Sequence, residues 1–88
     1  MQVSVISPDR RLYEGPAVSV SLPGSVGKFS VLKNHAPIVS VLTRGKIEIQ
    51  ESETADKRTF AIVSGFVEVH DNLVNICVEE DKNAQEKE

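Results

Sequence analysis

The chain has 88 residues, 40 % of them apolar, and a net charge of −3, which suits one small domain and leaves no room for a second. It has no apolar run long enough to span a bilayer and no basic stripe, so a soluble protein that does not bind nucleic acid is expected. Its single cysteine, Cys77, excludes an internal disulfide and a cysteine-based zinc site.

Apolar and polar residues alternate along most of the chain, which predicts half-buried β-strands. The clearest runs are residues 18–22, 47–50, 60–70 and 74–78. Within residues 60–70 the alternation passes through Gly65, where a bulge or a close approach of another backbone is expected. The core is expected to consist mainly of Val, Ile and Leu, with Phe29, Phe60 and Phe66. No segment before residue 79 has a helical period.

Turn signals separate these runs. Residues 7–10 (SPDR) suit a turn in which proline presets the backbone, residues 43–46 (TRGK) and 71–72 (DN) suit tight hairpins, and residues 52–58 suit a longer loop. The pattern predicts an all-β fold over residues 1–80, a small flattened sandwich or barrel of about eight to ten short, mainly antiparallel strands. Residues 81–88 are acidic and have no apolar stripe, so a disordered tail is expected.

The stretch from Gly24 to Lys28 invites comparison with a phosphate-binding loop. That motif needs a glycine where Leu22 stands, a serine or threonine where Phe29 stands, and a following helix, whereas a short strand is expected here. The glycines suit a tight chain reversal with Lys28 at its tip. Nucleotide binding is therefore not expected.

His35, in the segment NHAP, leaves a turn as a new strand begins. From the residues alone it could be a metal ligand, a general base, a plain loop residue or a contact to a partner. Neither it nor His70 has acidic residues patterned at ligand spacing, and no nucleophile with an orienting group is evident. A partner contact or a plain loop is therefore favoured, and no catalytic, cofactor or metal site is expected.

A generic small β binding module, or a carrier domain of the lipoyl or biotinyl type, is an alternative class. Such carriers present a lysine on a hairpin, and Lys46 after Gly45 is the closest candidate. The flanking residues typical of those families are not present beside it.

Several segments, in order, resemble the epsilon subunit of bacterial F-type ATP synthase. Residues 3–8 with 12–15 are similar to the family's first hairpin, and residues 22–29 to its P-G-x-x-G-x-F loop. Residues 34–39 resemble its N-H-A-P-L segment, residues 42–47 its L-x-x-G-x-I turn, and residues 64–69 its S-G-G-x-x-E-V strand. The matches cover residues 3 to about 79 and are specific as a set.

The resemblance implies a non-catalytic β-sandwich in the rotating central stalk, peripheral to the cytoplasmic face of the bacterial inner membrane, that links the gamma subunit to the membrane c ring. By position, Lys28 matches a site facing the c ring, and Ser7, His35 and Ser40 match sites near gamma. Apolar residues at 38–39 and 61–63 break the alternation, which predicts that a partner covers one face.

The family usually continues into two C-terminal helices that can inhibit ATP hydrolysis, whereas this sequence stops at Glu88. A natural short form is favoured over a segment of a longer subunit, because exposed polar ends are common at domain termini. On that reading, removing the subunit should impair coupling or assembly without releasing a helical block on hydrolysis.

Overall fold

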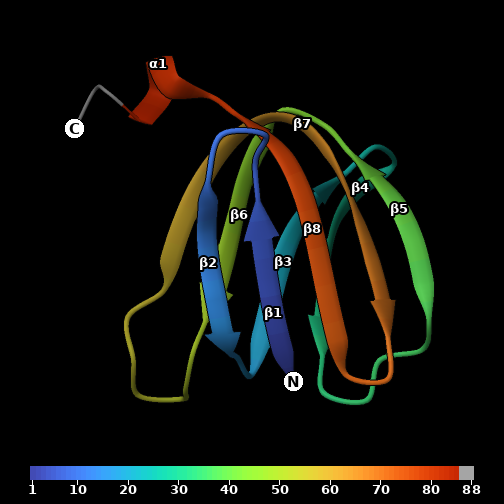
Figure 1. Ribbon diagram of the computed structural model, residues 1–88. Helices are drawn as coiled ribbons and strands as arrows, with labels where there is room; N and C mark the ends of the chain where they lie inside the picture. The colour runs from blue at the N-terminus through green and yellow to red at the C-terminus, as the bar shows by residue number, and fades with distance from the viewer. Residues whose placement is uncertain (86–88) are drawn as a thin grey trace.

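The computed structural model describes residues 1–85, which form eight β-strands followed by one helical turn (Figure 1). The elements are β1 (Gln2–Ile6), β2 (Arg11–Pro16), β3 (Ser19–Gly24), β4 (Gly27–Leu32), β5 (Ile38–Leu42), β6 (Gly45–Gln50), β7 (Arg58–His70), β8 (Leu73–Glu80) and α1 (Lys82–Gln85). All strand pairs in this part of the chain are antiparallel except β1 with β8. The predicted all-β fold of short, mainly antiparallel strands is confirmed.

The strands form one hydrogen-bonded sheet that folds into two layers. The long strand β7 takes part in both layers, and β3 and β5 also pair across them, at Gly24 and Leu42. The first layer has the order β2, β1, β8, the second half of β7, and β5. The second layer has the order β4, β3, β6 and the first half of β7. In Figure 1, β7 arches over one end of the molecule and so passes from one layer to the other. The flattened sandwich is therefore held together covalently at this end.

β7 changes layer at residues 62–64, where its register against β8 shifts. Gly65 follows directly, and it approaches β8 so closely that a Cβ there would lie 2.5 Å from the carbonyl oxygen of Cys77. The close backbone approach that the sequence predicts at Gly65 is confirmed, and the irregular register lies immediately before it.

The turns at residues 7–10 and 71–72 are confirmed, and the hairpin predicted at residues 43–46 is wrong. β5 and β6 both pair with β7, and the register from Ile38↔Val69 to Leu42↔Gly65 continues unchanged from Gly45↔Ile62 to Ile49↔Arg58. The two strands therefore lie end to end, and the residues between them form a bend. Gly45 is needed there for space, since a Cβ on it would lie 2.8 Å from Cβ of Pro23.

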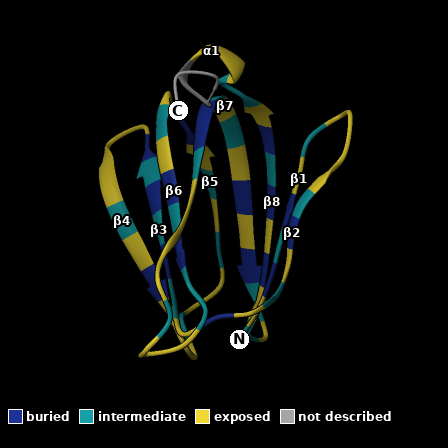
Figure 2. Cartoon of the chain, turned by 90° about the vertical axis from the view of Figure 1, so that its left-hand side faces the viewer, coloured by how far each residue is buried: buried dark blue, intermediate teal, exposed yellow. Residues whose placement is uncertain are grey.

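The core lies between the two layers and consists almost entirely of aliphatic side chains. Its largest fully buried members are Leu22, Leu42, Ile47, Ile49, Ile62, Ile76, Val3, Val5, Val20, Val31, Val67 and Val69. Phe29 and Phe60 pack against this core, as expected. Phe66 does not, because strand alternation turns it to the outside, where 51 % of its surface is exposed. Figure 2 shows the alternation of buried and exposed residues along the strands.

The chain leaves β8 at the end where β7 arches over. Asp81 N donates a hydrogen bond to Ala61 O at 2.9 Å, and α1 contacts β7. A helical turn therefore stands where the sequence predicts the start of a disordered tail, and residues 86–88 of that predicted tail lie outside the described residues. Among the described residues, no helix is long and apolar enough to cross a membrane.

Candidate partner interface

The outer face of the first layer carries a row of apolar side chains. Val41 pairs with Phe66, Phe66 with Cys77, and Cys77 with Ile6, so the row crosses β5, β7, β8 and β1. Val41 is 63 % exposed, Phe66 51 % and Ile6 40 %. Val39, next to the row on β5, is also exposed. We call Val41, Phe66, Cys77 and Ile6 the apolar row.

The outer face of the second layer has the opposite character. Ser30 pairs with Ser21, Ser21 with Glu48, and Glu48 with Thr59, which makes a polar row across β4, β3, β6 and β7. Leu32, near the end of β4, is the exposed aliphatic residue that interrupts this face. The outward row beside the apolar row, made of Val39, Glu68, Asn75 and Ser4, is mostly polar. A sheet face that is open to water normally carries polar side chains, so the apolar row is the candidate interface.

The predicted break in alternation at residues 38–39 is confirmed, whereas residues 61–63 have another explanation. Val39 is exposed and Ile38 is half-buried, so β5 does present apolar residues on both sides. Ala61 and Ile62 are both buried, because β7 crosses between layers there and Asp81 lies over Ala61. Ala61 and Ile62 are therefore part of the interior, whereas Val63 is half-buried and lines the depression beside the end of β8.

Lys28 lies at the start of β4, beside the β3–β4 turn, and its side chain is 68 % exposed. Its Nζ lies 3.9 Å from Oε1 of Glu48, which Lys57 approaches equally closely from the β6–β7 loop. The turn is followed by a strand, as the sequence predicts, and Gly27 has a φ of 139° that glycine accepts readily. This arrangement is a hairpin tip that leaves Lys28 available to a partner.

Ser40 lies in the middle of β5 and borders a shallow groove between β5 and β4. Val26, Phe29, Ile38 and Val39 line the same groove, as does Lys28. The structure therefore brings Ser40 and Lys28 to one groove, although the family resemblance implies different partners for them. Ser40 Oγ donates to the adjacent Val41 carbonyl at 3.3 Å.

His35 lies in the loop between β4 and β5, at the opposite end of the molecule from the β1–β2 and β3–β4 turns (Figure 1). Its backbone N–H donates to Leu32 O at 3.1 Å, which closes a turn, and its Nδ1 lies 2.7 Å from Ala36 O. His35 is half-buried, so it remains accessible to a partner at this end.

Ser7 begins the β1–β2 turn, and its hydroxyl is already engaged within the turn. Ser7 Oγ accepts hydrogen bonds from the backbone N–H groups of Asp9 and Arg10 at 3.3 and 3.2 Å, which is a common role for serine in turns. It also lies 3.5 Å from Oε2 of Glu80. Ser7 shapes this corner, and it borders the apolar row through a shallow depression that contains Ile6 and Phe66.

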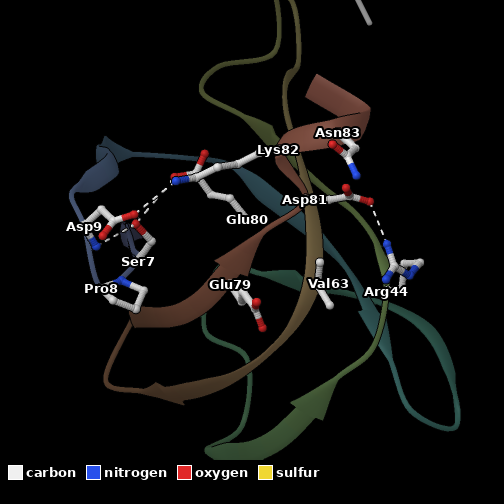
Figure 3. A pocket seen from close by; sticks show the side chains of 10 residues that line it. All are labelled: Ser7, Pro8, Asp9, Arg44, Val63, Glu79, Glu80, Asp81, Lys82 and Asn83. Atoms are coloured by element: carbon white, nitrogen blue, oxygen red, sulfur yellow. Dashed lines mark hydrogen bonds and ion pairs between the residues drawn. The ribbon is translucent and has the colours of Figure 1, made fainter. Parts of the chain in front are cut away.

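A cluster of ion pairs, which the sequence did not predict, surrounds the exit of the chain from β8 (Figure 3). Arg10 donates from Nε and Nη2 to both carboxylate oxygens of Glu80, at 3.2 and 3.1 Å, and only 4 % of the Glu80 side chain is exposed. These hydrogen bonds and the charge of Glu80 raise the pKa of Arg10. Lys82 meets Asp9 at 3.2 Å, so β8 and the start of α1 are tied to the β1–β2 turn.

Arg44 extends this cluster to the bend between β5 and β6, where its Nη1 lies 2.8 Å from Oδ2 of Asp81. The partners in the cluster are far apart in sequence, so no local spacing could have revealed them. Their common location follows from the fold, because the β1–β2 turn, the β5–β6 bend and the end of β8 meet at one end of the sandwich.

The carrier alternative loses its structural basis. Lys46 lies within β6 and pairs with Ala61 of β7, so it does not project from a hairpin tip. The lysine of a carrier domain has to stand on a turn in order to swing between sites.

Comparison with known proteins places the chain in a family. Residues 1–84 match the family described as the beta-sandwich domain of the ATP synthase delta/epsilon chain. The ATP synthase epsilon chain of Leptospira borgpetersenii serovar Hardjo-bovis is 43 % identical over 79 residues, which cover 90 % of this chain and 61 % of that protein. The epsilon chain of Nostoc punctiforme is 35 % identical over 89 % of this chain and 57 % of that protein.

Solved structures share the fold. A chain in the cryo-EM structure of the central stalk and c-ring of Tetrahymena thermophila mitochondrial ATP synthase superposes with a TM-score of 0.76 at 21 % identity. That match covers 91 % of this chain and 63 % of the other. A chain in a cryo-EM structure of Euglena gracilis mitochondrial ATP synthase gives a TM-score of 0.80 at 24 % identity, over 97 % of this chain and 58 % of the other.

The chain spans about three fifths of the length of the curated relatives that it matches, and the shared part is the β-sandwich. The match includes both the strands that form the core and the turns that carry Ser7, Lys28 and His35. The protein belongs to the family of ATP synthase delta/epsilon chain β-sandwich domains.

Proposed function

We propose that the protein is a non-catalytic rotor subunit of an F-type ATP synthase, which links the gamma subunit to the membrane c ring. Membership of the delta/epsilon family supports the assembly, and the apolar row supports a docking role. The single observation that carries the proposal is the apolar row itself, which crosses four strands on the outer face of the first layer, whereas the outer face of the second layer carries a polar row.

The apolar row is the proposed site of gamma. Stable complexes bury about 800 Å² on each partner. The protein has a total accessible surface of 5393 Å², so one face of the sandwich can supply an interface of that size. Phe66 lies inside the row, between Val41 and Cys77, and an aromatic residue near the centre of a patch is typical of the residues that dominate binding.

Ser7 adjoins the Ile6 end of the row, and the loop of His35 leads into β5 through Pro37. Ser40 follows Val39 and precedes Val41 on β5, and its side chain lies on the other side of the strand, in the groove toward β4. We assign all three to gamma, with Ser7 acting through the shape of its turn. Lys28, on the β3–β4 hairpin, is assigned to the polar loops of the c ring.

The proposal places the protein at the cytoplasmic face of a bacterial inner membrane, held there through the complex. Coupling would be mechanical: gamma and the c ring turn together because this domain contacts both. Proton translocation and ATP synthesis would take place on other subunits.

Co-purification tests the proposed assembly. A tagged chain, isolated from detergent-solubilised membranes of its own organism, should bring down gamma and the c subunit. Lys28→Glu should reduce recovery of the c subunit more than the same change at Lys33, which is exposed in the β4–β5 loop. Recovery of neither subunit would overturn the proposal.

Cysteine cross-linking tests which face binds gamma. In a Cys77→Ala background, Ser40→Cys and His35→Cys should form cross-links to gamma. Thr59→Cys, in the polar row, should not. Efficient cross-linking from Thr59→Cys together with none from Ser40→Cys would place gamma on the opposite face.

A further inference from the structure

Two turns at the same end of the sandwich meet through a pair of asparagines. Asn34 has a φ of 64° in the β4–β5 loop, and Asn72 has a φ of 61° in the β7–β8 turn. Asparagine tolerates this left-handed conformation better than most residues. The two residues are distant in sequence, yet their side chains are in direct contact.

The contact consists of two reciprocal hydrogen bonds. The backbone N–H of Asn34 donates to Oδ1 of Asn72 at 2.6 Å, and Nδ2 of Asn72 donates to Oδ1 of Asn34 at 2.9 Å. One carboxamide group thus satisfies both a main-chain and a side-chain group of the opposite turn. The backbone carbonyl of Asn72 also accepts a hydrogen bond from Gln2 N at 2.9 Å, which ties the start of β1 to the same turn.

These bonds hold the loop that carries His35. His35 is the next residue after Asn34, and its own backbone N–H is used to close the local turn onto Leu32. Residues 33–37 belong to no strand, so they have no ladder of hydrogen bonds to define their position. The side chain of Asn72 supplies two hydrogen bonds that reach this loop from a distant part of the chain.

We infer that Asn72 is a positioning residue for the gamma interface: its carboxamide group holds the His35 loop in the conformation that meets the partner. This role rests on the proposed function, in which His35 contacts gamma. The hydrogen bonds themselves belong to this chain alone, so their effect on the loop can be measured without any partner.

The test variant is Asn72→Gly, because glycine accepts a positive φ and an Asp-Gly pair suits a two-residue hairpin. The matched control is Asp71→Gly. Asp71 precedes Asn72 in the same turn with a φ of 52°, and its side chain lies 3.4 Å from His70 Nδ1, away from Asn34. Both variants remove a side chain from the same turn, and only Asn72→Gly removes the hydrogen bonds to Asn34.

Amide hydrogen exchange on the full chain measures how strongly Asn72 restrains the loop of residues 33–37. The Asn34 amide should exchange about five- to tenfold faster in Asn72→Gly than in the wild type, and at the wild-type rate in Asp71→Gly. Asn34→Gly keeps the main-chain donor and should loosen the loop less. An unchanged Asn34 exchange rate in Asn72→Gly would overturn the inference.

Binding to purified gamma measures the positioning role. Asn72→Gly should bind about three- to tenfold more weakly than Asp71→Gly, with the two variants unfolding at similar temperatures. The double variant Asn34→Gly/Asn72→Gly should bind no worse than Asn72→Gly, because both changes remove one contact. A loosened loop with unchanged affinity for gamma would refute the role.

The two failures can be told apart. If the wild-type chain does not bind gamma, the proposed function fails and the positioning role fails with it, whereas the exchange measurement still decides whether Asn72 holds the loop. If the wild type binds and Asn72→Gly binds equally well, only the positioning role fails.

Discussion

Replacing Phe66 by threonine should separate docking from folding. Phe66 is 51 % exposed and faces away from the core, so the change removes little of the packing inside the sandwich. Threonine suits a β-strand, which keeps the local backbone preference. If the apolar row binds gamma, the substitution should weaken binding to gamma more than it lowers the free energy of unfolding of the domain.

The magnitude follows from the exposed area. A buried phenylalanine covers about 200 Å². Since 51 % of Phe66 is exposed, docking would remove roughly 100 Å² of apolar surface from water. At about 25 cal/mol per Å² this area contributes about 2.5 kcal/mol, so Phe66→Thr should raise Kd by at most roughly sixtyfold, because threonine still buries its own methyl group. Val41→Thr, which exchanges a methyl group for a hydroxyl, should cost about 1 kcal/mol or roughly fivefold.

Affinity for purified gamma, by calorimetry or surface-immobilised binding, is the assay. Urea unfolding of each variant on its own supplies the folding control. Val18→Thr is the matched control for Val41→Thr, because Val18 is also a partly exposed valine and lies outside the apolar row. Val18→Thr should leave the affinity within about twofold of the wild type.

Equal affinity of Phe66→Thr and wild type, with both folded, would refute the reasoning that the apolar row is buried by gamma. If Phe66→Thr lowers the free energy of unfolding as much as it lowers the affinity, the result would also count against burial of the row by gamma, because the change would then act on folding.

Three further predictions concern the fold. Gly65→Ala should lower the free energy of unfolding by about 1–3 kcal/mol in urea, because its Cβ would meet Cys77 O at 2.5 Å, and a loss below about 0.5 kcal/mol would show that the strands relax easily. Glu80→Gln should lower the urea midpoint by weakening the paired hydrogen bonds from Arg10, and an unchanged midpoint would mean that this pair does not stabilise the end of β8. Burial, followed by the charge of Glu51, raises the pKa of Tyr13, so the fold favours the neutral phenol. The contribution of Tyr13 to the free energy of unfolding should be complete below a pH of about 10 and should be lost as the pH rises through the folded pKa. Tyr13→Phe should lose less stability at alkaline pH than the wild type, and an equal loss in both proteins would contradict this account.

The sequence predicted the strands well because each has a clear period of two. The positions Val3, Val20, Ile47 and Val74 are all buried, as alternation requires. The turn at residues 71–72 was also predictable. A two-residue hairpin turn needs a positive φ at both positions, and Asp71 and Asn72 are residue types that adopt it. Local chemistry was sufficient in these cases.

Strand pairing was less predictable, because it depends on partners that are distant in sequence. The TRGK segment contains a typical hairpin signal, yet β5 and β6 lie end to end along β7. Gly45 is required there by the proximity of Pro23, a neighbour that local spacing does not identify. Phe66 was expected in the core from its residue type, whereas the alternation with Val67, Glu68 and Val69 turns its side chain outward.

The sequence by itself determined the all-β class, the aliphatic core and the family, since these depend on periodicity and on ordered local motifs. Only the tertiary structure decided which side chains share a face or an end. The apolar row combines single residues from four strands, the ion-pair cluster joins β1–β2 to the exit of β8, and Asn34 meets Asn72 across two turns. The physical reason is that such sites are made by long-range strand register, which sets every neighbour across a sheet and which no short stretch of the chain encodes.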